Sequence, residues 1–331
     1  MSNAQKTLLF NRSSFEALLT MEDYIEAVAN AHRLHAEQKV IATNLIHADA
    51  PNGEYHIKTG GLLGERAYYG LKANGGFFNN QRNHGLPNIL GIIYLSDAAT
   101  AYPLAVFESS LISKMRTAAA TAVAARYLKP TGAIRLGVIG YGNQAEAQIE
   151  ALRCVCSIGE VRIAGRDAEK VASFVEKMRQ QTGLIITAES IQTTCENSNV
   201  LVTCTPATDY FVKKEWIQKG TFIAAVGADS PGKNELEPSL VAAAKVVADI
   251  QSQVVKVGES QHAIQQGLMG KDAIYGELGT LITGALKGRT SEDEIFIYDS
   301  TGTAIQDVAA AAYVYEKLKD EPTIQSINLF A

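Results

Sequence analysis

The sequence predicts an α/β protein in which a doubly wound parallel sheet is joined to a second domain of helix and sheet. Two observations predict the parallel sheet. Short apolar runs alternate with helical stretches after residue 134, and a glycine-rich turn follows the first of these runs. A third observation is length, because 331 residues exceed what one hydrophobic core usually serves. Two domains are therefore expected.

The first third of the chain predicts a helix followed by a sheet. In residues 22–37, apolar side chains recur at three- and four-residue steps, which is the period of an amphipathic helix. The sequence pattern then changes to short runs typical of β-strands, such as 54–58 and 90–95, which are separated by loops rich in glycine and asparagine. The alanine-rich segment 108–127 favours a closely packed helix that ends before Pro130.

Beyond residue 134 the chain alternates between strand-like and helical segments. The strand-like runs are 136–139, 161–163, 200–203, 222–226, 246–248 and 295–298. Their nearly continuous apolar character is what a parallel sheet covered on both faces requires. A final helix is expected over 304–319, with an alanine-rich face suited to packing on the first domain.

Composition excludes several classes of partner. The net charge of −5 and the pI near 5.8 give no basic field for nucleic acid or for anionic lipid. Residues 1–10 lack the features of a signal peptide, and no run reaches about 18 apolar residues, so a cytoplasmic protein is expected. The cysteines are too irregularly spaced for disulfides or zinc, so reduced thiols and no metal site are expected; they are Cys154, Cys156, Cys195 and Cys204.

A glycine-rich turn after the run 136–139 predicts a dinucleotide site on a Rossmann domain. Gly140 permits the tight turn, Gly142 lets the backbone approach a pyrophosphate, and Ala145 allows close packing of helix and strand. Asn143 and Gln144 lie between Gly142 and Ala145, and the helical run 146–153 that follows carries partial positive charge at its N-terminus. We expect all five residues to contact the cofactor.

The end of the second strand bears on the choice of cofactor. Gly165 stands where NAD enzymes usually place an acidic residue that binds the ribose 2′-hydroxyl. Arg166 follows and can pair with a 2′-phosphate, whereas Asp167 is suited to cap the helix that begins at Ala168. NADP(H) is therefore favoured over NAD(H), with a solvent-exposed Arg166 and bound NAD as the alternative.

Six segments in order resemble one known family. They are 113–119, 140–145, 203–206, 226–233, 276–279 and 299–302. They resemble the ornithine cyclodeaminase and mu-crystallin family from about residue 20 to the C-terminus. The resemblance implies a split α+β domain, residues 1–127 plus 304–331, that binds substrate and forms a homodimer. It further implies a Rossmann domain over 128–303, with the active site in the cleft between the two.

The same resemblance implies roles for three charged residues. Lys72 and Arg116 match residues that hold the substrate carboxylate, and Asp229 matches the proton carrier, so Asp229 and Lys72 form the expected catalytic set. Two cations on one carboxylate give charge-assisted hydrogen bonds and fix the orientation of a small amino acid. The alternatives are a structural salt bridge for Arg116, a solvated lysine for Lys72 and a turn-capping role for Asp229.

Residues that follow other strands are expected to line the nicotinamide, because ligands of doubly wound folds bind beyond the carboxyl ends of the strands. These residues are Thr205, Pro206, Val226, Gly227, Ser300 and Gly302.

Two departures from the family pattern stand out. Many relatives place an arginine after a proline near residues 42–44, and this chain has neither. Many also have a methionine where this chain has Lys58, which either replaces the missing cation or is an exposed strand lysine. Together with the segment 72–80, this pattern resembles a branch of alanine dehydrogenase-like and ectoine-utilisation proteins. His56 is given no role, because a lone histidine is more often structural than catalytic.

The expected function is hydride transfer between NAD(P)(H) and the α-carbon of a small L-amino acid or its imine, including cyclic imines. Such an enzyme is an amino-acid dehydrogenase or a ketimine reductase. One alternative is an ornithine cyclodeaminase-type ammonia lyase that recycles its NAD. The other is a non-catalytic, NADPH-binding protein of the mu-crystallin kind. The altered set of cations argues against the first alternative, and Asp229 argues against the second.

Overall fold

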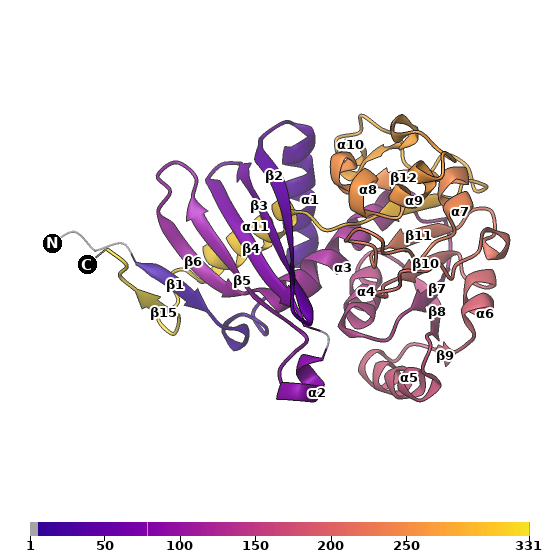
Figure 1. Ribbon diagram of the computed structural model, residues 1–331, viewed down its shortest axis with the longest axis horizontal. Helices are drawn as coiled ribbons and strands as arrows, with labels where there is room; N and C mark the ends of the chain where they lie inside the picture. Colours follow the sequence, from indigo (N-terminus) through magenta and orange to yellow (C-terminus); the bar gives the residue numbers. More distant parts are fainter. Residues whose placement is uncertain (1–5, 78, 331) are drawn as a thin grey trace. The chain divides into compact units, whose positions relative to one another are not determined.

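The computed structural model describes residues 6–77 and 79–330. Residues 1–5 of the N-terminal stretch and Phe78 of the segment 72–80 lie outside the described residues. The chain forms two compact units, which we call unit 1 and unit 2 (Figure 1). Unit 1 comprises residues up to 116 together with those from 303 onward, and unit 2 comprises residues 117–302. The predicted domain limits at 127/128 and 303/304 stay predictions.

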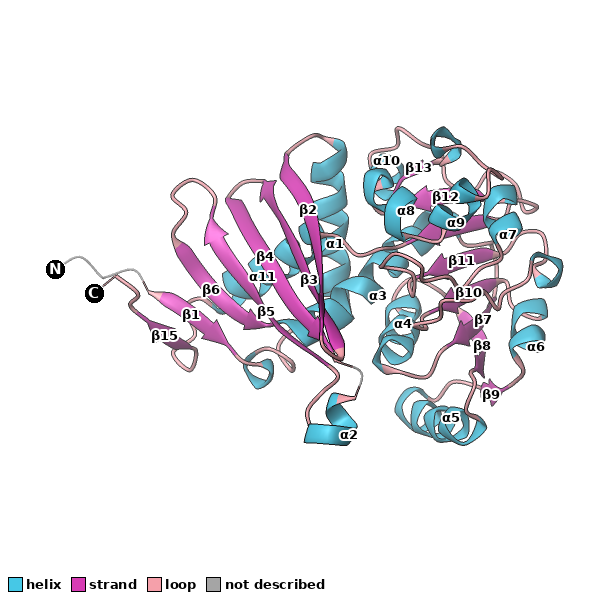
Figure 2. Cartoon of the chain, viewed as in Figure 1, coloured by secondary structure: helices cyan, strands magenta, loops and turns pink. Residues whose placement is uncertain are grey.

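Unit 1 is built on a seven-stranded sheet in the order β15-β1-β6-β5-β4-β3-β2. The strands are β1 (Thr7–Phe10), β2 (Val40–Ala50), β3 (Gly53–Leu63), β4 (Ala67–Gly76), β5 (Ile89–Asp97), β6 (Pro103–Glu108) and β15 (Gln325–Ile327). Helices α1 (Met21–Ala36) and α11 (Ala304–Leu318) cover one face of this sheet, and the short α2 (Asn80–His84) follows β4 (Figure 2). The other face carries exposed apolar side chains.

A pair of glycines determines how closely α11 approaches the sheet. Gly60 of β3 lies directly opposite Gly70 of β4. A Cβ added at Gly60 would lie 3.2 Å from Cβ of Ala304, and one at Gly70 would lie 3.0 Å from Cγ2 of Val308. Both contacts are tighter than normal packing, so larger residues would push the helix outward. The first turn of α11 is therefore held close to β3 and β4.

Unit 2 contains an eight-stranded, wholly parallel sheet in the order β13-β12-β14-β11-β10-β7-β8-β9. The strands are β7 (Ile134–Ile139), β8 (Ile158–Ala164), β9 (Ile186–Ala188), β10 (Val200–Thr203), β11 (Phe222–Ala225), β12 (Lys245–Ala248), β13 (Gly276–Glu277) and β14 (Phe296–Asp299). The first strand, β7, lies between β8 and β10. The direction of winding therefore reverses there, at the position where doubly wound sheets bind ligands.

Helices flank this sheet on both faces (Figure 2). They are α4 (Asn143–Arg153), α5 (Ala168–Thr182), α6 (Ile191–Glu196), α7 (Pro238–Ala243), α8 (Gln251–Val257), α9 (Ser260–Gln265) and α10 (Leu278–Ile282). Helix α3 (Ser109–Leu128) contains the division between the units at 116/117, and six of its alanines are fully buried. Short 3-10 turns occur at Arg12–Ser14, Lys214–Trp216 and Lys271–Ala273.

The predicted α/β class with a doubly wound parallel sheet is confirmed. All six strand-like runs beyond residue 134 form strands, and three helices with predicted limits, α1, α3 and α11, begin and end within one residue of those limits. The strands β9 and β13, which have three and two residues, were not predicted. The expectation of glycine- and asparagine-rich loops in the first third was wrong for Ala67–Gly76, which is strand β4, between β5 and β3.

Two further expectations can be compared with the structure. All four cysteines are free thiols, as expected. Within the described part of the chain, no helix combines the length and the apolar character needed to cross a membrane.

Candidate functional site

In unit 2 the last residues of five strands lie side by side. The registers pair Ile139 of β7 with Ala164 of β8 and with Thr203 of β10, and Ala225 of β11 with Thr203 and with Asp299 of β14. The segments that leave these strands therefore start from one edge of the sheet. The predicted cofactor-binding residues all belong to these segments, so the fold brings them together at the carboxyl edge.

The glycine turn after β7 has the local geometry that a pyrophosphate requires. Gly140 has φ +130°, a backbone conformation that side chains disfavour, and a Cβ there would lie 2.6 Å from Sγ of Cys204. Gly142 precedes α4, and a Cβ on it would meet nothing within 4 Å. Asn143 is exposed and Gln144 half-buried, whereas Ala145 is fully buried against the sheet. The turn thus presents an open backbone surface at a helix N-terminus.

Side-chain contacts explain the glycine at the end of β8. A Cβ on Gly165 would lie 2.4 Å from the ring of Tyr141, so any side chain there would displace this tyrosine. Asp167 accepts a hydrogen bond from the backbone N–H of Lys170 at 3.1 Å and caps α5, as expected. Arg166 lies between them and is exposed. The acidic side chain nearest to the expected ribose position is therefore engaged elsewhere.

Asp229 lies in the loop after β11, and its side chain is 42% exposed. Its Oδ1 is 2.5 Å from Nζ of Lys233 and accepts a hydrogen bond from Oγ of Ser230 at 3.3 Å. The sequence predicted Asp229 but not its partner Lys233, which lies four residues later in the same loop.

Glu235 is a buried carboxylate that the sequence did not point to. The N–H and Oγ1–H of Thr205 both donate to its Oε1 at 2.7 Å, and the N–H of Gly227 donates to its Oε2 at 3.0 Å. Burial raises the pKa of Glu235 above its ordinary value, and these hydrogen bonds oppose the rise. Glu235 therefore fixes the loops after β10 and β11, in which the predicted residues Thr205, Pro206, Val226 and Gly227 lie.

Two more buried carboxylates hold the segment around Glu235. Glu259 accepts hydrogen bonds from the backbone N–H groups of Glu235 at 2.8 Å and of Leu236 at 3.0 Å. Asp299 in turn accepts from the backbone N–H of Glu259 at 3.0 Å and from the N–H and Oγ–H of Ser260. Each carboxylate thus positions the segment that carries the next one.

The segment after β14 is fixed by a fourth carboxylate. Asp249 accepts hydrogen bonds from the N–H groups of Thr301 at 2.8 Å and Gly302 at 2.7 Å. Ser300, one of the predicted residues, is buried, and its Oγ has no hydrogen-bond partner among the described residues. A buried hydroxyl of this kind suits hydrogen bonding to a ligand.

In unit 1 the two predicted carboxylate-binding residues meet at the first turn of α11. Lys72 of β4 places Nζ 2.8 Å from Oδ2 of Asp307, and Arg116 of α3 places Nε 2.9 Å from Oδ1 of the same carboxylate. The guanidinium also donates to Oε1 of Gln306 at 2.9 Å, and the Gln306 amide contacts His32 Nε2 at 2.9 Å. Asp307 was not predicted.

Lys58 joins this group, which we call the cation cluster: Lys58, Lys72 and Arg116 around Asp307. Lys58 lies directly opposite Lys72 in the sheet, and its charge acts on both Lys72 and Asp307. All three cations are at most 5% exposed, so Lys58 is not the exposed strand lysine of the alternative. Three basic side chains thus surround the carboxylate of Asp307 in a buried place.

Burial and crowding of like charges shift the protonation of this cluster. Burial, reinforced by the nearby Arg116, lowers the pKa of Lys72 to about 7, although Asp307 opposes the shift. Burial alone would raise the pKa of Asp307, but Arg116, Lys72 and Lys58 hold it below its ordinary value. Lys72 can therefore gain or lose a proton near neutral pH.

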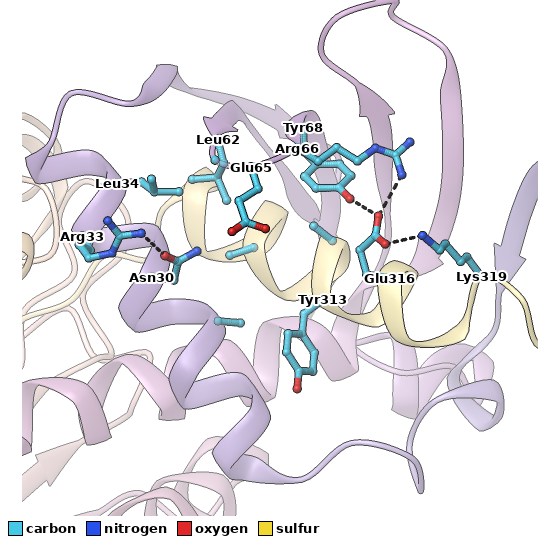
Figure 3. A pocket seen from close by; sticks show the side chains of 14 residues that line it. Asn30, Arg33, Leu34, Leu62, Glu65, Arg66, Tyr68, Tyr313, Glu316 and Lys319 are labelled. Carbon is cyan, nitrogen blue, oxygen red and sulfur yellow. Dashed lines mark hydrogen bonds and ion pairs between the residues drawn. The ribbon is translucent and has the colours of Figure 1, made fainter.

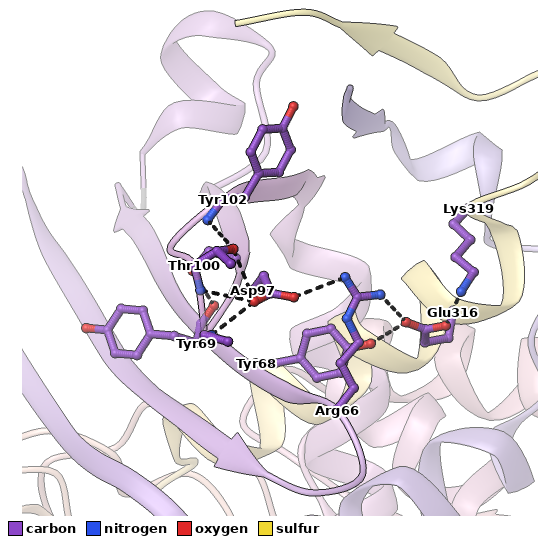
Figure 4. Close-up of polar contacts among 10 residues, drawn as sticks. Arg66, Tyr68, Tyr69, Asp97, Thr100, Tyr102, Glu316 and Lys319 are labelled. Carbon is purple, nitrogen blue, oxygen red and sulfur yellow. Dashed lines mark hydrogen bonds and ion pairs between the residues drawn. The ribbon is translucent and has the colours of Figure 1, made fainter. Parts of the chain in front are cut away.

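A surface hollow of about 590 Å³ lies elsewhere in unit 1, between α1, the β3–β4 turn and the second half of α11 (Figure 3). Several of its charged side chains are paired. Arg66 pairs with Glu316 at 2.9 Å and with Asp97 at 3.3 Å, and Lys319 pairs with Glu316 at 2.6 Å (Figure 4). No member of the cation cluster lines this hollow, so we do not place the reaction there.

Comparisons with known proteins show the family of this chain. The model of the ornithine cyclodeaminase/mu-crystallin family matches residues 5–322. The chain is 36% identical over 330 residues to the alanine dehydrogenase of Archaeoglobus fulgidus, covering 98% of this chain and 99% of that protein.

Two solved structures share the whole fold. An archaeal alanine dehydrogenase dimer with bound NAD superposes with a TM-score of 0.92 at 35% identity, covering 98% of this chain and 100% of that one. The Δ1-pyrroline-2-carboxylate reductase of Thermococcus litoralis, in complex with NADH and L-proline, gives 0.92 at 30% identity, covering 97% and 100%. The predicted oxidoreductase class fits these relatives.

Proposed function

The chain belongs to the ornithine cyclodeaminase/mu-crystallin family, and on that premise we propose that it transfers hydride at the α-carbon of a small L-amino acid or its imine. The observation that carries this proposal is the cation cluster, in which three buried basic side chains surround the carboxylate of Asp307. A substrate carboxylate is proposed to bind among these cations.

The cluster suits the recognition of a small molecule for two reasons. Arg116 is rigid and offers several donors, and it is already aimed by its contacts with Asp307 and Gln306. Lys72, with its lowered pKa, becomes a full ammonium when an anion binds beside it. Lys58 adds a third positive charge, in place of the arginine that many relatives carry. Together these groups fix the carboxylate and hence the direction in which the α-carbon points.

Asp229 is assigned the proton transfer at the amine or at the attacking water. When bound, the nicotinamide supplies or accepts the hydride. In the dehydrogenase direction the amino acid loses hydride from its α-carbon and becomes an imine, to which water adds before ammonia and a 2-oxo acid leave. In the reductase direction a cyclic imine gains hydride at the α-carbon and a proton on nitrogen.

The proposed cofactor is NADP(H). The support lies at the end of β8, where Gly165 leaves no acidic group for the ribose, Asp167 caps α5, and the exposed Arg166 can meet a 2′-phosphate. Gly142, Asn143 and the N-terminus of α4 are proposed to hold the pyrophosphate. Ser300, with its buried hydroxyl, is proposed to bind the nicotinamide end.

A homodimer is proposed as the working form. The face of the unit 1 sheet opposite α1 and α11 exposes apolar side chains from β1, β2, β3 and β5: Leu9, Ile46, Tyr55, Leu63, Leu90 and Ile92. A spread of this kind over one sheet face usually marks a protein interface. Sedimentation equilibrium tests it, because a monomer at micromolar concentration would contradict the proposal.

The activity is tested by offering the protein small L-amino acids, 2-oxo acids with ammonia, and cyclic imines, each with NAD(H) and with NADP(H). Cofactor absorbance and ammonia are followed together. A net change in cofactor matched to substrate consumption supports the proposal. Ammonia release without a net change in cofactor would instead identify a cyclodeaminase. Cofactor binding without turnover of any substrate would identify a binding protein.

A further inference from the structure

The β2–β3 hairpin holds a group of metal-ligating side chains that the proposed reaction does not use. The antiparallel register places His47 opposite His56 and Asp49 opposite Glu54. Because side chains two residues apart on a strand share a face, all four side chains project from the same side of the hairpin. Two consecutive cross-strand pairs thus present two imidazoles and two carboxylates together.

The distances within this group are those of side chains that converge on one point. His56 Nε2 lies 3.2 Å from Oε1 of Glu54, and His47 Nδ1 lies 3.8 Å from Oε2 of the same carboxylate. The two imidazole rings are 4.8 Å apart between centroids, and one ligand atom from each of His47, Glu54 and His56 lies within 4.8 Å of the others. Ligand atoms around a tetrahedral Zn²⁺ with bonds of about 2 Å are separated by roughly 3.3 Å. Small rotamer changes suffice to reach this spacing.

We propose that His47, Glu54 and His56 bind a divalent transition-metal ion of the Zn²⁺ class, with the carboxylate of Asp49 or a water in the fourth position. Two imidazole nitrogens and a carboxylate oxygen are ligands that Zn²⁺ accepts readily. Both strands are held in the sheet, so three ligands are pre-positioned by the backbone. His47 Nε2 is 3.1 Å from Oδ1 of the exposed Asp49, which leaves the ion a route from solvent.

This site differs from what the sequence predicted. No metal site was expected from the spacing of the cysteines. The ligands are instead histidine and glutamate residues on two strands, and their convergence depends on the register of the hairpin. A bound ion would cross-link β2 to β3. It would also add positive charge on the sheet face that carries Lys58, two residues from His56.

The test is a Zn²⁺ titration of the 331-residue protein. The protein is first treated with a chelator, and binding is measured by calorimetry. We expect one ion per chain and a loss of affinity of tenfold or more in His47→Ala and in His56→Ala, because even outer-shell substitutions at metal sites cost about 10–100-fold. Glu54→Gln, which keeps the size of the side chain, should weaken binding similarly. His84→Ala removes an exposed histidine on α2 and serves as the matched control. Circular dichroism checks that each variant is folded.

Titration with Co²⁺ separates this site from the free cysteines. We expect the visible absorption of a site with nitrogen and oxygen ligands, without the charge-transfer band of a thiolate. A thiolate band, or Zn²⁺ affinity equal to wild type in both histidine variants, would overturn the proposal. So would the absence of stoichiometric binding, which would leave the four side chains as an ion-paired cluster. Unchanged Zn²⁺ binding with altered substrate preference would assign them to substrate recognition instead.

Discussion

Asp307 in unit 1 and the trio Glu235, Glu259 and Asp299 in unit 2 are all fully buried carboxylates, but their partners differ. Asp307 is surrounded by basic side chains, which together hold its pKa below the ordinary value. The trio accepts hydrogen bonds from backbone N–H and hydroxyl groups, and burial raises the pKa of each. Similar carboxylates therefore experience opposite electrostatic environments in the two units.

This difference indicates that the buried carboxylates of the two units have different roles. The carboxylates of unit 2 satisfy backbone groups of loops that leave the sheet, so their task is to fix loop geometry around the proposed cofactor site. Asp307 is surrounded by three cations, which suit the binding of a second anion. In the proposed enzyme, rigid loops thus serve the cofactor and the cation cluster serves the substrate.

The largest expected effect concerns Asp229, whose side chain is 42% exposed, unlike the buried trio Glu235, Glu259 and Asp299. A positioned general acid or base contributes about 10²–10⁴-fold, so Asp229→Asn should lower kcat by that order while cofactor affinity barely changes. Steady-state kinetics on a verified substrate measure this, and the pH profile of kcat/KM should lose one limb. Asp293→Asn, which alters an exposed carboxylate, is the control. Wild-type turnover with an unchanged pH profile would make Asp229 structural.

The next largest effect, on kcat/KM, concerns the cation cluster. Lys72→Ala and Arg116→Ala should each lower kcat/KM by about tenfold or more, because removing one partner of a buried charge pair costs about 2–5 kcal/mol. Cofactor binding should stay intact. Lys58→Ala should behave in the same way, and normal kinetics in this variant would exclude Lys58 from substrate binding. Lys219→Ala, whose parent side chain is 76% exposed, is the matched control.

The protonation of Lys72 predicts that kcat/KM also depends on pH. Its pKa is lowered to about 7, so the ammonium is present below this pH and is lost as the pH rises through it. The value of kcat/KM for a carboxylate substrate should therefore fall above about pH 7. In Lys72→Arg, which retains its charge, this limb should move to higher pH. An identical limb in wild type and Lys72→Arg would assign the titration to another group.

A smaller effect is expected for cofactor choice. Arg166→Ala should weaken NADPH binding by about 1.5–3 kcal/mol, the contribution of a hydrogen bond to a charged group, and should change NADH binding less. Fluorescence titration of both cofactors measures the difference, with Arg153→Ala as an exposed control. Equal losses for both cofactors would show that Arg166 does not recognise a 2′-phosphate.

The last effect is on stability and concerns the carboxylates that fix the loops. Burial raises the pKa of Asp299 from 3.8 to about 7, so the folded state holds this proton more tightly than the unfolded state does. Its contribution to the free energy of unfolding is full below about pH 4 and is lost as the pH rises towards 7. Asp299→Asn should flatten this decline in urea unfolding at a series of pH values. Asp272→Asn, at an exposed aspartate, should not, and equal slopes in wild type and Asp299→Asn would contradict the assignment.

Much of the fold could be predicted from the sequence, because the parallel strands of unit 2 are continuous apolar runs and the turn at Gly140 follows the first of them. Strand β4 was harder to recognise. Gly70 and Gly75 lower its strand propensity, yet Gly70 is needed where α11 crosses the sheet. The local sequence of β4 favours a loop, but tertiary packing makes this segment a strand.

The residues of the candidate site were likewise predicted only in part. Lys72, Arg116, Asp229 and the glycine turn were predicted from motifs, and the structure gathers them within their own units. Asp307 and Glu235 were missed because their roles depend on contacts with residues far away in the sequence, such as Arg116 and Thr205. The order Gln306-Asp307 on an alanine-rich helix was the available signal, since a charged residue on such a buried face needs a partner.

The central claim, that there is net hydride transfer between the α-carbon of an amino acid and the cofactor, is tested most directly by an isotope. The protein is incubated with oxidised cofactor and with an amino acid that has been verified as a substrate and is deuterated at the α-carbon. The reduced cofactor is then analysed by mass spectrometry. The account predicts one deuterium in each reduced cofactor and one imine or 2-oxo acid formed with it. Deuterium that returns to the α-carbon of a cyclised product, with ammonia released and no reduced cofactor accumulating, would contradict it.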